Sequence, residues 1–136
     1  MQSISFLQVV LPVTFTLEPG EKWLIAPEFV DEKKFILKPT VKYDVKPSSF
    51  TFRTELFAPL LAVTPYDTLD EAIDLVNGLD YGLTSGIQTL DEQEQKYWKD
   101  HIQAGNLYIN RGITGAIVNR QPFGGMKLSA FGPGPE

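Results

Sequence analysis

The chain has 136 residues, a formal net charge of −5, one histidine and no cysteine. With 43% hydrophobic and 21% charged residues, it has the composition of a folded globular protein with its own core, and intrinsic disorder is excluded. The acidic balance argues against nucleic-acid binding, and the absence of cysteine excludes disulfides, thiolate metal sites and a cysteine nucleophile. We expect residues 1–136 to form a single domain.

The first feature in chain order is an apolar run over residues 4–17, interrupted by Gln8 and Pro12. It is too short to span a bilayer and has no basic residue ahead of it. We therefore favour a buried or edge strand over a signal peptide. On this interpretation the protein is cytoplasmic and has no membrane partner.

The first half of the chain is rich in proline, with seven of the ten prolines in residues 1–65. Prolines at this density prevent long helices, because each lacks an amide hydrogen and clashes with the preceding turn. Aromatic and β-branched residues at Lys22–Ile25 and over residues 34–43 predict short edge strands joined by loops.

Two helices are predicted in residues 66–104, which contain no proline. The first begins with the capping box TLDE at residues 68–71, in which Thr68 caps the amide of Glu71 and Glu71 reaches back. Apolar residues then recur at helical spacing, and Gly78 is suited to end the helix.

The second helix begins with the same four letters at residues 89–92, so that Thr89 is its predicted cap. Its apolar face consists of Leu90, Tyr97 or Trp98, and Ile102, and Gly105 ends it. Lys99 and His101 lie near its end, which suits the helix dipole.

Three apolar runs alternate with these helices, at Leu60–Val63, residues 83–87 and residues 106–110. Strands that alternate with helices of this length favour a parallel sheet covered by helices. The predicted fold class is therefore α/β, a parallel-sheet βαβαβ unit preceded by a short-strand, proline-rich segment.

Residues 111–136 hold six of the eleven glycines and show no periodic pattern, which predicts a long loop after the last strand. Glycines allow backbone amides to turn toward an anion, and Arg111 and Arg120 favour a carboxylate or phosphate. The alternative is a surface loop whose glycines only satisfy turn geometry. Neither glycine-rich phosphate-binding motif is present in the chain.

A second stretch of interest is residues 53–59, where Glu55 and Phe57 stand two residues apart just before Pro59. Together they could hold a sugar hydroxyl and a ring. Taken alone, Glu55 is more typical of a solvated or capping acid, and Phe57 of a core residue.

Several motifs, in order, resemble the aldehyde dehydrogenase superfamily. Residues 55–60 (ELFAPL) are similar to its E-x-F-G-P-V segment, and residues 122–129 (PFGGMKLS) to its P-F-G-G-x-x-x-S segment. The intervening runs YGLTSG at 81–86 and AGNLYIN at 104–110 also fit. The run RGITGAIV at 111–118 resembles the Δ1-pyrroline-5-carboxylate (glutamate γ-semialdehyde) dehydrogenase branch, whereas residues 1–17 match nothing in the family.

The resemblance implies roles for five residues. It implies that Glu55 binds the nicotinamide-ribose hydroxyls of NAD and that Phe57 packs near the nicotinamide ring. It implies that Gly115 and Ala116 offer backbone amides to the substrate carboxylate and that Phe123 lines the aldehyde pocket.

The chain also departs from the family pattern. The family's catalytic cysteine, general-base glutamate, oxyanion asparagine and dinucleotide-binding domain precede E-x-F, and none is in this chain. We therefore expect the carboxyl-terminal part of an NAD-dependent dehydrogenase acting in proline catabolism, inactive alone and prone to self-association. The alternatives are a non-catalytic binding or assembly module that reuses the fold, and a small carboxylate-binding protein.

Overall fold

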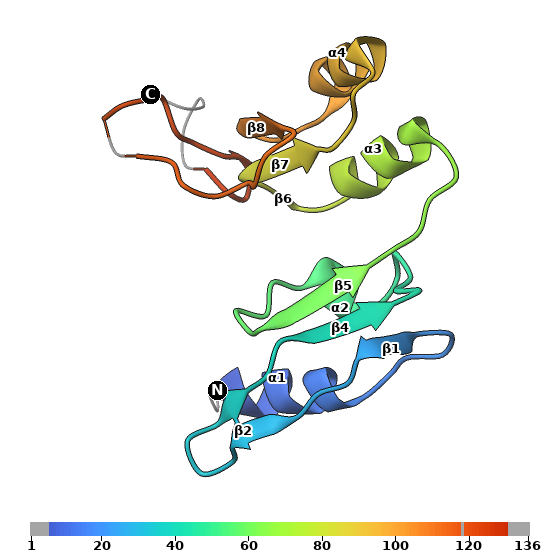
Figure 1. Cartoon of the computed structure of the whole chain (residues 1–136), viewed down its shortest axis with the longest axis vertical. Coiled ribbons are helices and arrows are strands. Elements are labelled where there is room, and N and C mark those ends of the chain that lie inside the picture. The colour runs from blue at the N-terminus through green and yellow to red at the C-terminus, as the bar shows by residue number, and fades with distance from the viewer. Residues whose placement is uncertain (1–5, 118, 131–136) are drawn as a thin grey trace. The chain divides into compact units, whose positions relative to one another are not determined.

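The computed structural model describes residues 6–117 and 119–130, which form two compact units, Met1–Pro65 and Tyr66–Glu136 (Figure 1). Each unit is described below by itself, and the expected single domain stays a prediction. No helix in the described part of the chain is both long and apolar enough to cross a membrane.

The first unit begins with helix α1 (Phe6–Phe15), so the strand predicted over residues 4–17 is wrong. Val10 and Thr14, one helical turn apart, are both buried, and the Thr14 hydroxyl donates to the Val10 carbonyl at 2.7 Å. A continuous apolar run does not by itself distinguish helix from strand. The helix accommodates Pro12 in its interior, where the sequence had suggested an interruption.

The unit's main sheet has three strands in the order β1 (Lys22–Ile25), β4 (Thr40–Tyr43) and β5 (Leu60–Val63). β4 pairs antiparallel with β1 and parallel with β5. A separate hairpin joins β2 (Phe29–Asp31) and β3 (Ile36–Leu37), and Phe29 stacks on Phe15 with ring centroids 5.0 Å apart. The short strands predicted in this region are confirmed.

The short helix α2 (Phe50–Arg53) lies between β4 and β5 in the chain. Ser49 caps it, because its hydroxyl oxygen accepts from the Phe52 amide at 3.3 Å. β4, α2 and β5 therefore form a parallel βαβ connection, which delivers the chain from α2 to β5 through residues 54–59.

The second unit contains α3 (Leu69–Asn77), β6 (Tyr81–Gly82), β7 (Thr84–Ile87), α4 (Glu92–His101), β8 (Asn106–Ile109) and β9 (Met126–Lys127). β7 pairs in parallel with β8, from Thr84 opposite Asn106 to Ile87 opposite Ile109. Ile73, Trp98 and Ile102 form the buried core between the two helices and this sheet.

The α/β class is confirmed, but the three predicted strands belong to two sheets. β5 pairs with β4 in the first unit, and β7 pairs with β8 in the second. Residues 40–43, predicted as an edge strand, instead form the middle strand β4, the parallel partner of β5. The structure also contains the strand β9, which pairs antiparallel with β6 and lies in a stretch predicted to be loop.

The first predicted cap is confirmed and the second is wrong. Thr68 accepts from the Glu71 amide at 3.2 Å, although the Glu71 carboxylate accepts from Asp67 rather than from Thr68. α4 is capped by Asp91, whose carboxylate accepts from the amides of residues 93 and 94. The Asp91 carboxylate thus satisfies the amides two and three residues ahead, which is the ordinary N-cap geometry.

The ends of α4 also differ from the prediction. The helix ends at His101, with Ile102 as its cap, rather than at Gly105. Leu90 precedes the helix and is 92% exposed, so it does not belong to the apolar face, which is formed by Trp98 and Ile102.

Candidate functional site

The first candidate site is a cavity of about 340 Å³ in the first unit, next to α2. Glu55 and Phe57, the residues singled out from the sequence, both line it. Its walls are completed by α2 and by the start of β5, with the lining residues Thr51, Thr54, Glu55, Leu56, Phe57, Ala58, Leu60 and Ala62.

Phe57 is 81% exposed, so its interpretation as a core residue is wrong. Leu56 takes the buried position instead, with 9% exposure. Phe57 also adopts a left-handed φ of 49°, a conformation that is uncommon for a bulky residue. Residues in such conformations cluster at binding sites, which makes this segment a candidate one.

The second candidate site is the loop between β8 and β9 in the second unit. A cavity of about 650 Å³ opens there, lined by Ala116, Ile117, Asn119, Arg120, Gln121, Pro122 and Phe123. Three residues expected at an anion or substrate site, namely Ala116, Arg120 and Phe123, therefore share one cavity. Gly115 directly precedes its lining and has a φ of 90°, which favours glycine.

The carboxyl-terminal end of this loop is fixed to the sheet by its glycine pair. Asn106 donates to the Gly124 carbonyl at 2.8 Å, and a Cβ on Gly105 would collide with that same carbonyl. Ser129 accepts from the Gly82 amide at 3.1 Å. The P-F-G-G-x-x-x-S pattern thus describes an anchoring device, in which Gly125 leaves room for the close approach of Ser129, and Ser129 bonds to Gly82.

The Arg111 side chain binds to the backbone of its own loop. Its guanidinium donates to the carbonyls of Gly112 and Thr114 at 3.3 and 3.2 Å and lies 5.2 Å from the centre of the Tyr108 ring. Arg120 lines the cavity instead. Since residues 110–125 contain no acidic residue, this loop favours an anionic ligand.

Sequence reasoning missed a buried ion pair near the first cavity. Glu21 and Lys42 have side chains only 1% exposed, and their charged atoms lie 3.2 Å apart. The sequence carries no signal for this pair, because the two residues are 21 positions apart, Glu21 just before β1 and Lys42 on β4, and neither differs in sequence from an ordinary surface charge. Within the described ranges, no group of three or more metal-ligating side chains is found.

Comparison with known proteins gives a consistent result. The model of the aldehyde dehydrogenase family matches residues 15–135. A curated relative, the 1-pyrroline-5-carboxylate dehydrogenase of Geobacillus sp. (strain WCH70), is 39% identical over 99 residues, which is 73% of this chain and 19% of that protein.

Solved structures of related enzymes are also similar to this chain in sequence and fold. Proline utilization A from Corynebacterium freiburgense is 44% identical with a TM-score of 0.84, covering 88% of this chain and 12% of that one. The 1-pyrroline-5-carboxylate dehydrogenase from Thermus with bound NAD is 36% identical with a TM-score of 0.71, covering 75% and 20%. The chain therefore spans about a fifth or less of these relatives, and its resemblance to the 1-pyrroline-5-carboxylate dehydrogenase branch is confirmed.

Proposed function

Because the chain belongs to the aldehyde dehydrogenase family, we propose that it is the carboxyl-terminal portion of the catalytic domain of a 1-pyrroline-5-carboxylate dehydrogenase. The parent enzyme oxidises glutamate γ-semialdehyde to a carboxylate with NAD, in proline catabolism and in the cytoplasm. In this proposal the chain supplies binding groups and not the reacting thiolate.

The observation that carries the proposal is that both family segments line cavities. Residues 55–57 line one of about 340 Å³, and residues 116, 117 and 119–123 line one of about 650 Å³. The first offers a carboxylate and an exposed ring, and the second offers an arginine and an apolar wall. The carboxylate and the ring suit a nicotinamide ribose, and the arginine and the apolar wall suit a substrate that carries a carboxylate.

The residues of the first cavity fit NAD by their chemistry. The Glu55 carboxylate is exposed, and its two oxygens can each accept from a ribose hydroxyl. The exposed Phe57 ring offers an apolar face to the nicotinamide. When bound, NAD accepts a hydride from the substrate.

In the second cavity, the amides of Gly115 and Ala116 and the guanidinium of Arg120 hold the substrate carboxylate. The aldehyde end then lies toward Phe123, whose ring excludes water from it. These groups orient the substrate, and a thiolate from outside this chain attacks the aldehyde.

The isolated chain is expected to give no NADH with pyrroline-5-carboxylate, and to bind NAD weakly at best. A chimera tests the positive part of the proposal. In it, this chain replaces the matching segment of the Geobacillus enzyme, and NADH formation from pyrroline-5-carboxylate is measured.

We expect the chimera to be active. Glu55→Gln is expected to raise the KM for NAD, and Phe123→Ala the KM for the aldehyde. A folded chimera without activity, or Glu55→Gln kinetics equal to those of the parent chimera, would contradict the proposal. Turnover by the isolated chain above a heat-treated control would contradict its assignment as a partial catalytic unit.

A further inference from the structure

The buried pair of Glu21 and Lys42 connects three parts of the first unit. Lys42 lies on β4, with its ammonium 5.5 Å from the centre of the Trp23 ring on β1. A buried ion pair contributes little net stability, because desolvation offsets most of the attraction between the charges. Its contacts therefore point to a role beyond stability.

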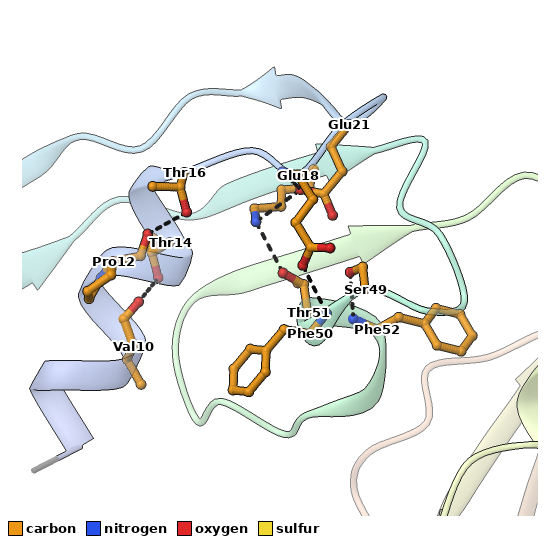
Figure 2. Close-up of polar contacts among 11 residues, drawn as sticks. Val10, Pro12, Thr14, Thr16, Glu18, Glu21, Ser49, Phe50, Thr51 and Phe52 are labelled. Carbon is orange, nitrogen blue, oxygen red and sulfur yellow. Dashed lines mark hydrogen bonds and ion pairs between the residues drawn. The ribbon is translucent and has the colours of Figure 1, made fainter. Parts of the chain in front are cut away.

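Lys42 makes a second contact, which leads to α2. Its ammonium donates to the Thr51 hydroxyl at 3.1 Å, and this contact is also buried. The start of α2 is held by Glu18, whose carboxylate accepts from the Phe50 amide at 2.9 Å (Figure 2). Glu21 in turn accepts from the Glu18 amide at 2.9 Å, so the two acids and the lysine form one network around α2.

The helix that this network holds cannot be stable by itself. α2 has four residues, and a single helical turn fixes several dihedral angles for one hydrogen bond. Ser49 and Glu18 satisfy its first turn by accepting from the amides of Phe52 and Phe50. Its position also depends on the contact between Lys42 and the Thr51 hydroxyl.

The segment that follows α2 is the one that carries Glu55 and Phe57. The Thr54 amide closes the helix by donating to the Phe50 carbonyl at 3.0 Å, and Glu55 comes next. Thr51, which receives the Lys42 hydrogen bond, lines the same cavity as Glu55 and Phe57. A displacement of Thr51 would therefore change the shape of that cavity.

We propose that Lys42, held by Glu21, is a positioning residue that fixes α2 through Thr51 and thereby sets Glu55 and Phe57 for their ligand. Lys42 does not line the cavity and acts only through Thr51. The ligand part of this inference rests on the proposed function, whereas the ordering of the segment does not.

The test is the order of residues 54–57 in the full chain, measured by amide ¹⁵N relaxation. Thr51→Val removes the acceptor with little change of shape, and Thr51→Ser restores it. We expect order parameters of Glu55, Leu56 and Phe57 to fall from about 0.85 to below about 0.6 in Thr51→Val. Thr51→Ser is expected to return them to the original values.

A double variant separates position from stability. Lys42→Met alone leaves a buried carboxylate without its partner and is expected to lower Tm, whereas Glu21→Gln with Lys42→Met removes both charges and restores much of it. Order at residues 54–57 is expected to stay low in the double variant. Lys38→Met, which breaks the exposed pair with Glu28, is the matched control and leaves these residues unchanged.

Unchanged order parameters in Thr51→Val, or order that returns together with Tm in the double variant, would overturn the inference. If Lys42→Met does not fold, the two Thr51 variants decide the question. Titration with nicotinamide mononucleotide is a separate measurement. Made on the folded chimera with the Geobacillus enzyme, an absence of binding would count against the proposed function and leave the relaxation result standing.

Discussion

The side-chain amide of Asn110 pairs with the backbone of Thr89 through two hydrogen bonds. Its oxygen accepts from the Thr89 amide at 2.9 Å, and its nitrogen donates to the Thr89 carbonyl at 2.8 Å. Asn110 thus extends the pairing of β7 and β8 by one further position, at the point where the glycine-rich loop begins. Its φ of 55° is left-handed, a conformation that asparagine tolerates.

Asn110→Ala is expected to lower the free energy of unfolding by about 1–3 kcal/mol, since it removes two hydrogen bonds and adds left-handed strain. Asn119→Ala is the control, because Asn119 has a similar φ of 62° in the same loop. Urea unfolding of both variants measures the difference. Equal losses would show that backbone strain, and not the pairing with Thr89, decides the effect.

The hydrogen bond between Tyr97 of α4 and Asp70 of α3 predicts a pH dependence. The Tyr97 hydroxyl donates to the Asp70 carboxylate at 2.6 Å, which raises the pKa of Tyr97 above its ordinary value of 10.0. A raised pKa stabilises the neutral tyrosine in the folded state. The hydrogen bond therefore contributes to the stability of the fold. This stability is fully present below pH 10.0 and is lost as the pH rises through the higher pKa of Tyr97 in the folded state.

Asp70→Asn is expected to bring the pKa of Tyr97 back toward 10.0, because the acceptor loses its charge. An NMR titration of ¹³C-labelled tyrosine measures this value, with the signal assigned from Tyr97→Phe. Asp80→Asn, another exposed acid of the same unit, serves as the control. A Tyr97 titration that is the same in all three chains would refute the prediction.

The loop cavity in the second unit is expected to bind a dicarboxylate. Glutarate, followed by amide NMR, should shift residues 112–116. Arg120→Gln should weaken binding about tenfold, the effect of losing one charge-assisted hydrogen bond. Arg53→Gln, an exposed arginine of the first unit, is expected to change nothing. An ordered loop that shows no shifts would rule out this anion site.

The isolated chain is expected to self-associate through the sheet of the first unit. β1 and β5 are its outer strands, and no further strand pairs with them among residues 6–117 and 119–130. Leu24, Ile25 and Leu61 are 62%, 50% and 58% exposed on these strands. Open strand edges with exposed apolar side chains favour association.

Light scattering at high micromolar concentration checks this expectation. Leu61→Lys should shift the population toward monomer, because a charge on an outer strand opposes edge pairing. Leu90→Lys is the matched control, since Leu90 is 92% exposed but lies outside the sheets. A monodisperse monomer in the original chain, or equal effects of the two lysines, would be incompatible with association through the strand edges.

Sequence alone determined the features that depend on local chemistry. The cap at Thr68, the strands at residues 22–25 and 60–63 and the βαβ pattern of residues 84–109 follow from side chains near in sequence. The motifs also identified which short segments line the two cavities. In each case the relevant interactions span only a few residues, or one helical or strand period.

Tertiary structure decided what local pattern left open. The letters TLDE occur twice, yet Thr68 caps α3 whereas Asp91, not Thr89, caps α4. The Thr89 backbone is paired with Asn110, which follows β8, and its hydroxyl donates to the Glu94 carboxylate. Phe57 lies outside the core because Leu56 occupies the buried position. The pairing of β5 with β4, and the burial of Lys42 against Glu21 and Thr51, depend on contacts between distant residues, and no local pattern predicts which distant partner a strand or a charge will find.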